Sequence, residues 1–178
     1  MKKNNGFTLL EVLVVMLIIG AFFFVAVPKF QDLTEVNLKS ASRNLTATIK
    51  YLYNEAAFKK SIHRLTFDIE AGEYWVETLQ NSEFGGGQTQ EFGLSEESTQ
   101  IRHKLPNGVY FKDVVTERTL ERNPLDEENE YILFLPTGFV EPAVIHIFTD
   151  DESYYTLATK PYTGGTKVYD QYVELLRR

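Results

Sequence analysis

Gly6-Phe7-Thr8-Leu9-Leu10-Glu11, followed by the uncharged run of residues 12–27, is the stretch that decides the fold of this chain. A short basic leader that contains Lys2 and Lys3 precedes it. One carboxylate, that of Glu11, stands at the start of the apolar run. At the centre of a bilayer a charged side chain costs about 2.5–3.5 kcal/mol on insertion scales, so a carboxylate in this position indicates a functional site.

The apolar stretch of residues 7–27 is close to the roughly 20 residues that a helix needs to span hydrocarbon. An ordinary secretory signal or signal anchor is the simpler interpretation. A secretory signal has an apolar core of about 7–15 residues and then a small-residue cleavage site. Here the run is longer, carries Glu11 on its leader side and continues past Pro28 into a helical pattern. An ordinary anchor gains nothing from the carboxylate, so the pattern favours a more specialised signal.

The leader, the glycine, the carboxylate, the apolar run and Pro28 together resemble the class III signal of type IV pilins and type II secretion pseudopilins. The resemblance implies that prepilin peptidase cleaves after Gly6 and N-methylates the new terminal residue, Phe7. It also implies that Glu11 pairs with the charged terminus of a neighbouring subunit during assembly.

The same resemblance divides the chain into three parts. Residues 1–6 would be a cleaved leader, residues 7–28 a transmembrane and assembly helix, and residues 29–178 a periplasmic globular domain. The expected location is the bacterial inner membrane, with a single pass and the C-terminal domain in the periplasm, from which the protein moves into the periplasmic pseudopilus. Expected partners are other pseudopilins, major and minor, prepilin peptidase and the inner-membrane assembly platform.

Composition narrows the function classes. The chain has 18 Lys and Arg against 25 Asp and Glu, a net charge of −7, and loss of Lys2 and Lys3 with the leader makes this 16 against 25, or −9. A nucleic-acid-binding surface needs a basic patch, so nucleic acid is not an expected partner. Cysteine is absent, which excludes a disulfide framework and a thiolate metal site.

Behind Pro28, apolar residues recur mostly at three- and four-residue spacing with charged residues between them, as on an amphipathic helix. Pro28 lacks a backbone donor and should kink the helix. Joined to the apolar run, the helix should extend from about residue 7 to about residue 60, roughly 80 Å at 1.5 Å per residue. The apolar face consists of Phe30, Leu33, Leu38, Ala41, Leu45, Ile49, Leu52 and Ala56. A coiled-coil stalk is the alternative, but the spacing is no strict heptad, so packing on a sheet is expected.

From Ile62 the apolar period changes to two, and the turn Glu70-Ala71-Gly72 predicts a hairpin with residues 74–78. Residues 81–100, which are rich in glycine, and residues 117–130 are expected to be polar surface connections. Short strands with turn residues between them predict antiparallel sheet, and with the helix they predict an α+β fold. The further strands expected lie at residues 109–111, 131–135, 143–148, 154–159 and 168–175.

The β-rich second half resembles the H-type minor pseudopilin and FimT-like group within the pilin superfamily. The resemblance rests on the aliphatic strand and glycine turn of residues 132–138 and on the paired strands around residues 144–148 and 154–158. Globular domains of that group are similar to a helix packed on two antiparallel sheets. Major pseudopilins, the nearest competitor, have a shorter globular part and a calcium loop near the C-terminus.

Catalytic, metal and cofactor chemistry are not expected. His63, His103 and His146 are far apart and form no metal-ligand pair, and His63 and His146 fall in predicted strands. The acidic turns Asp126–Glu130 and Asp150–Glu152 could offer oxygen ligands to calcium, but neither has EF-hand spacing. The chain is therefore not expected to be an enzyme.

Three functions from different classes follow. The first is a minor pseudopilin that assembles through its N-terminal helix and supports export of folded proteins across the outer membrane. The second is a FimT-like minor type IV pilin for pilus assembly or DNA uptake, which would need a basic C-terminal surface where the sequence offers Arg177 and Arg178. The third, a membrane-anchored periplasmic enzyme, has no supporting constellation of residues.

Overall fold

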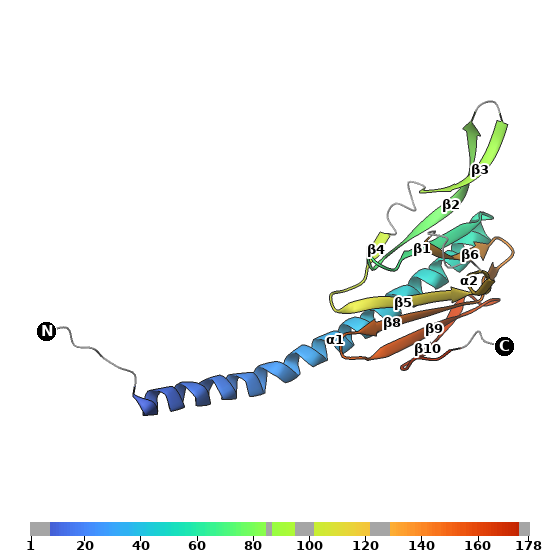
Figure 1. Ribbon diagram of the computed structural model, residues 1–178. Coiled ribbons are helices and arrows are strands. Elements are labelled where there is room, and N and C mark those ends of the chain that lie inside the picture. The colour runs from blue at the N-terminus through green and yellow to red at the C-terminus, as the bar shows by residue number, and fades with distance from the viewer. Residues whose placement is uncertain (1–7, 85–86, 95–101, 122–128, 175–178) are drawn as a thin grey trace.

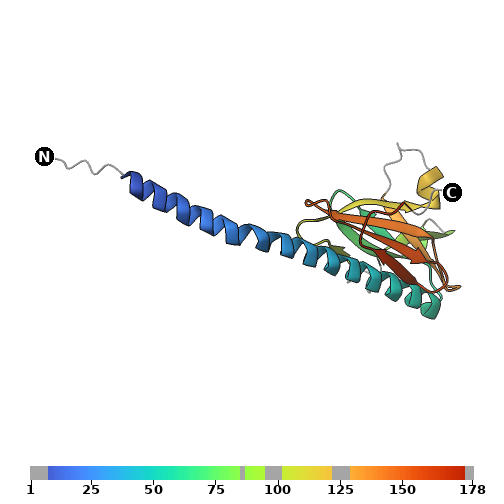
Figure 2. The ribbon, with the colours of Figure 1, turned by 90° about the horizontal axis from the view of Figure 1, so that it is seen from below.

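The computed structural model describes residues 8–84, 87–94, 102–121 and 129–174, without the side chains of residues 25–34, 81–84, 87–89 and 120–121. One long helix projects from the molecule at one end and lies against two β-sheets at the other (Figures 1 and 2). The predicted α+β class is confirmed.

Helix α1 spans Leu9–Lys59, within two residues of the predicted start and end. Thr8 is its N-cap, and Lys60 ends it in the left-handed conformation with φ 55°. The helix continues through Pro28, although proline has no amide hydrogen to donate there. The predicted kink at Pro28 stays a prediction.

The first sheet, sheet A, has the strand order β3-β2-β1-β6-β7, and β4 pairs with β2. Strands β1 and β2 pair antiparallel with Leu65 opposite Val76, which confirms the predicted hairpin. Gly72 in its turn has φ 67°, a conformation that glycine adopts without strain. The strands are β1 (His63–Asp68), β2 (Glu73–Phe84), β3 (Gly87–Gly93), β4 (Arg102–Lys104), β6 (Glu130–Leu135) and β7 (Phe139–Val140).

The second sheet, sheet B, has the order β10-β9-β8-β5 and is antiparallel throughout. Its strands β5, β8 and β9 lie where the sequence predicted strands, although β5 continues five residues beyond the predicted end at Phe111. The register between β5 and β8 shifts between Phe111 and Asp113. The strands are β5 (Val109–Thr116), β8 (Ala143–Thr149), β9 (Tyr154–Lys160) and β10 (Gly165–Tyr169).

The core lies where α1 meets the apolar faces of both sheets. Six of the eight residues predicted for the buried helix face are at most 2% exposed, so the helix packs on the sheets and the stalk alternative is wrong. The side chains of the other two, Phe30 and Leu33, lie outside the described part. The six are Leu38, Ala41, Leu45, Ile49, Leu52 and Ala56.

The outer face of sheet A is stabilised by arginines stacked on aromatic rings. The Arg64 guanidinium carbon lies 4.5 Å from the centroid of the Phe92 ring and 5.1 Å from that of Tyr131, and Arg64 also pairs with Glu77. Cation–π contacts of this kind contribute about 0.5–1 kcal/mol at exposed sites. Arg64 thereby links β1 to β3, the outermost strand of the sheet.

The prediction that residues 81–100 form a surface loop is wrong over much of its length. Residues 81–84 continue β2, and Gly87–Gly93 forms β3, which pairs with it from Thr78 opposite Gly93 to Phe84 opposite Gly87. These residues carry no strand signal because this hairpin extends past the core. Most residues of its outer part, 81–90, are polar at both alternating positions, and apolar alternation is the signal from which strands are predicted. Residues 95–100 lie outside the described part.

One further boundary was wrong, that of the last strand, and the connection 117–130 contains a helix that was not predicted. The polar connection 117–130 begins with a short helix, α2 (Glu117–Glu121), whose Thr119 amide donates to Thr116 Oγ1 at 3.3 Å. The last strand, expected at residues 168–175, is β10 at Gly165–Tyr169. After Tyr169 the chain leaves the sheet. Thr156 Oγ1 donates to the Gln171 carbonyl oxygen at 2.7 Å, so a side-chain hydrogen bond holds this segment in place of backbone pairing.

Truncation of the buried helix face should destabilise the fold. Leu45 is fully buried, so Leu45→Ala should lower the free energy of unfolding by about 2–5 kcal/mol through lost burial and a residual cavity. Val36 on the same helix is exposed, and Val36→Ala should change it by at most about 0.5 kcal/mol. Urea unfolding of the full chain in detergent micelles, followed by circular dichroism, measures both. Equal effects would contradict the assigned helix face.

Candidate functional site

The N-terminal end of α1 places Thr8 and Glu11 at the start of the apolar helix. The Glu11 amide donates to Thr8 Oγ1 at 3.2 Å and to the Thr8 carbonyl oxygen at 3.0 Å, and the Val12 amide donates to the same carbonyl at 3.3 Å. Thr8 is therefore the cap, and Glu11 lies in the first helical turn. A carboxylate is favourable there because the helix N-terminus carries a partial positive charge.

The Glu11 carboxylate could serve the helix or a partner. Thr8-Leu9-Leu10-Glu11 has the capping-box pattern, in which the glutamate accepts a bond from the N-cap amide. Within the described residues only the threonine half of that box is formed, and the carboxylate makes no hydrogen bond or ion pair. Glu11 is exposed, so its charge is accessible to a cation from another molecule.

An uncovered apolar surface follows directly behind Glu11. Every large apolar side chain from Leu9 to Phe24 is exposed, from 44% at Val14 to 86% at Leu9. This part of α1 projects away from both sheets (Figure 2). Contiguous exposed apolar surface of this extent marks an interaction site for protein or membrane.

None of the described helices combines the length and the apolar character that a membrane-spanning segment needs.

The predicted processing residues are only partly within the described structure. Gly6 and Phe7 lie outside the described residues, and Pro28 is described by its helical backbone alone. Among the predicted site residues, Glu11 is the one whose side chain the structure describes.

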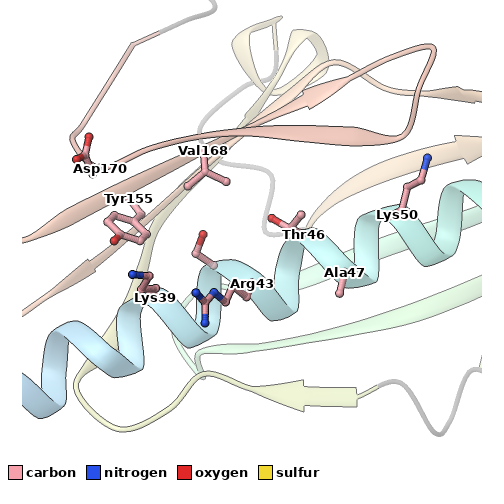
Figure 3. A pocket seen from close by; sticks show the side chains of 9 residues that line it. Lys39, Arg43, Thr46, Ala47, Lys50, Tyr155, Val168 and Asp170 are labelled. Carbon is pink, nitrogen blue, oxygen red and sulfur yellow. The ribbon is translucent and has the colours of Figure 1, made fainter.

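A second site, which the sequence analysis did not predict, is a groove between α1 and the inner face of strands β9 and β10 (Figure 3). Its volume is about 730 Å³. Lys39, Arg43 and Lys50 line it from the helix, and Tyr155 and Val168 line it from the strands. The sequence carries no signal for the groove, because its basic residues fall between the apolar positions of an amphipathic helix and its far wall comes from distant strands.

His63 has a structural role. Its Nε2 lies 2.8 Å from Ser61 Oγ and its Nδ1 lies 2.9 Å from Thr78 Oγ1, so both ring nitrogens have partners. Burial outweighs the charge of Glu55 and keeps the pKa of His63 below its ordinary value. His63 is therefore a satisfied neutral side chain that ties β1 to β2.

His146 faces two acceptors. Its Nδ1 bonds to Asp113 Oδ1, its Nε2 lies 3.1 Å from the Val173 carbonyl oxygen, and its ring stacks on Tyr172 with centroids 4.2 Å apart. A neutral imidazole donates from one nitrogen only, so the imidazolium is the form that satisfies both partners. Burial alone would lower the pKa of His146, but the bonds to Asp113 and Val173 and the charge of Asp113 outweigh it and raise the pKa above its ordinary value.

No metal site emerges among the described residues, where no three His, Cys, Asp or Glu side chains are grouped to hold an ion. His103 lies on β4 beside the Tyr74 ring, with centroids 5.3 Å apart. The acidic turn Asp150–Glu152 lies within the described part, whereas most of Asp126–Glu130 lies outside it.

The comparisons with known proteins agree with the predicted resemblance at both ends of the chain. Residues 1–27 match the prokaryotic N-terminal methylation motif. Two solved structures of the minor pseudopilin EpsH from the type 2 secretion system of Vibrio cholerae are similar to this chain, with TM-scores of 0.51 and 0.52 and sequence identities of 13% and 14%. Each covers 75% of this chain and 97% or 95% of the EpsH chain. No curated protein sequence matches the chain. The likeness confirms the predicted pilin-like fold, with its long N-terminal helix on antiparallel sheets.

The His146–Asp113 pair should make stability depend on pH. Because the folded pKa is raised, its stabilisation is fully present below the unfolded value of about 6.5 and is lost as pH rises through the folded pKa. Asp113→Asn lets a neutral imidazole accept a bond from the amide, so the pKa of His146 should fall and stability should decline less between pH 5.5 and 8.5. NMR titration of the imidazole and urea midpoints in detergent micelles measure both quantities.

The control for this experiment is Asp170→Asn, because Asp170 is exposed, lines the groove beside α1 and is not among the groups that shift the pKa of His146. It should leave the pKa of His146 and the pH dependence unchanged. If Asp113→Asn behaves as Asp170→Asn does, the pair does not govern the titration of His146.

Proposed function

We propose that this chain, which combines a prokaryotic N-terminal methylation motif with the fold of a minor pseudopilin, is a minor pseudopilin of the type II secretion system. In this role it assembles through its N-terminal helix and supports export of folded proteins across the outer membrane. The observation that carries the proposal is the carboxylate of Glu11, which pairs with no described residue and stands at the start of an exposed apolar helix that no described part of the chain covers.

Processing is the first step of the proposed role. Prepilin peptidase would cut after Gly6 and methylate the amine of Phe7, which frees residues 7–178. A glycine before the cut leaves space for the peptidase, because it has no side chain. After the cut the new amine stands one residue before Thr8, the helix cap, and so close to the N-terminal end of α1.

Anchoring is the second step. Residues 7–28 would lie in the inner membrane, and residues 29–178 would form the periplasmic domain. The exposed side chains from Leu9 to Phe24 support this division because burying them in lipid or against other apolar helices removes them from water. Cysteine is absent, so the domain needs no oxidising conditions to fold.

Assembly is the third step. A carboxylate in an apolar setting is costly unless it is paired, and the terminal amine of a neighbouring subunit would neutralise Glu11. Other pseudopilins, major and minor, and the inner-membrane assembly platform are the proposed partners. The hairpin of β2 and β3 extends past the sheet (Figure 1), and a shaft of repeated copies would have to accommodate it at every subunit. A low-copy adaptor between tip and shaft fits this shape better.

A FimT-like pilin for DNA uptake is less well supported. The net charge of −7 repels nucleic acid, and Arg177 and Arg178, which would begin a basic C-terminal surface, lie outside the described residues. The expectation that the chain is not an enzyme stays a prediction.

Gly6 and Glu11 should act at separate steps. Gly6→Val should leave an uncleaved precursor because its side chain obstructs the peptidase. Glu11→Val should be cleaved but fail to assemble because the charge pair is lost. Immunoblots of membrane and sheared-fibre fractions separate the two outcomes.

Glu11→Gln is the matched control for helix capping, because glutamine is also accepted at this position of a capping box. If the charge matters, Glu11→Gln should fail to assemble as Glu11→Val does. Normal assembly of either Glu11 variant would contradict charge pairing.

Crosslinking should identify the neighbours. The chain has no native cysteine, so single cysteines at Val14 and Val25 report contacts of the N-terminal helix without background. A low-copy adaptor should crosslink mainly to different pseudopilins, and the same cysteines combined with Glu11→Val should give no crosslinks. Ladders of the chain crosslinked to itself would indicate a major subunit instead.

A further inference from the structure

The groove between α1 and sheet B has two walls of different chemistry. Lys39 and Arg43 stand on the helix wall, one turn apart, and Tyr155 and Val168 stand on the sheet wall facing them (Figure 3). Asp170 lies at one end. A ligand that fills the groove therefore meets cations on one side and an aromatic ring and an aliphatic side chain on the other.

The cations of the helix wall are available to a ligand. Lys39 and Arg43 are exposed, and neither makes a hydrogen bond or ion pair with a described residue. Lys50, further along, already donates to the Thr163 carbonyl oxygen at 2.7 Å. Three basic side chains against the single carboxylate of Asp170 make the groove positive in a chain whose net charge is −7. Charge complementarity thus selects an anionic ligand.

The sheet wall selects against a ligand that is charged throughout. Val168 is 43% exposed and Tyr155 is half-buried, so their apolar surfaces are incompletely covered. β10, which carries Val168, is an edge strand of sheet B, so it pairs with one described strand only. These features favour a peptide over a nucleic acid, whose binding to so few cations would be weak at physiological salt.

The spacing of the cations matches an extended peptide. Four residues of α-helix separate Lys39 from Arg43, an axial distance of about 6 Å. Two residues of an extended strand advance about 6.6 Å, and successive side chains point to opposite sides. Carboxylates at two alternate positions would meet Lys39 and Arg43. The apolar residue that follows each carboxylate points to the opposite side and would meet Tyr155 or Val168.

We propose that this groove is a docking site for an extended segment of a partner protein in which acidic and apolar residues alternate. The segment would place two carboxylates against Lys39 and Arg43 and two apolar side chains against Tyr155 and Val168. The site is separate from the apolar N-terminal end of α1, so it adds a second contact surface to the same helix.

The test measures binding of a labelled peptide to the full chain in detergent micelles. Fluorescence anisotropy is recorded with fluorescein-labelled Thr-Glu-Val-Glu-Val-Thr and with the same peptide carrying glutamine in place of glutamate. The acidic peptide should bind more tightly, and Lys39→Glu with Arg43→Glu should weaken it about tenfold or more because attraction becomes repulsion. Val168→Ser should also weaken binding, because it removes apolar contact.

Lys167→Glu is the matched control, since Lys167 is exposed on β10 beside Val168 and points to the opposite face of the strand. It should change the affinity less than about twofold at 0.15 M salt, where the screening length is about 8 Å. The milder double variant, Lys39→Gln with Arg43→Gln, should also weaken binding while its circular dichroism spectrum and melting curve stay unchanged. This result would show that the loss of affinity does not come from misfolding of the charge-reversed chain.

Three results would overturn the proposal. The first is equal affinity for the glutamate and glutamine peptides, and the second is equal loss of affinity from the Lys167 control and from the groove variants. The third is tighter binding of a labelled oligothymidylate than of the acidic peptide at 0.15 M salt, because the ligand would then be a polyphosphate chain and not a peptide.

Discussion

The burial of one face of α1 against two sheets is the interaction on which the rest of the structure depends. Leu45 and Ile49 in its middle are fully buried, and full burial of such a side chain contributes about 1.5–3 kcal/mol. No disulfide supports the fold, because the chain has no cysteine. Helix α1 continues towards its N-terminus for more than 20 residues beyond the core. Packing on the sheets therefore sets the direction of an apolar segment that the sheets do not cover.

This arrangement leaves the Glu11 carboxylate exposed, as the assembly role that we propose for it requires. A carboxylate in the first turn benefits from the helix dipole, and Thr8 already caps the helix through its hydroxyl. The cap therefore does not use the Glu11 carboxylate, which stays accessible to a partner. An exposed apolar run that begins with a charge paired to no described residue is unfavourable for an isolated molecule. In the proposed assembly, packing of several such helices with the charge paired would remove both costs.

The sequence predicted those parts of the fold that have a local signal. The first half of α1 follows from its continuous apolar run. The second half and the β1–β2 hairpin follow from apolar periods of about 3.6 and 2. The β2–β3 hairpin was missed because residues beyond the core carry no apolar alternation, and its pairing is a backbone ladder. The pairing of His146 with Asp113, and the groove, depend on residues far apart in the chain that only the fold brings together.

The groove and the apolar segment lie on one continuous helix, α1, and this sets a geometric relation between them. Fifteen residues of helix separate Phe24 from Lys39, about 22 Å along the axis. A neighbouring molecule that packs its own helix on residues 9–24 would therefore have its globular part displaced along the same axis, near the level of the groove. Contacts made at the two places would reinforce each other, because the second is formed within one complex and at a high effective concentration. A weak interaction at Lys39 and Arg43 would then be sufficient to select among neighbours that the apolar helix alone does not distinguish.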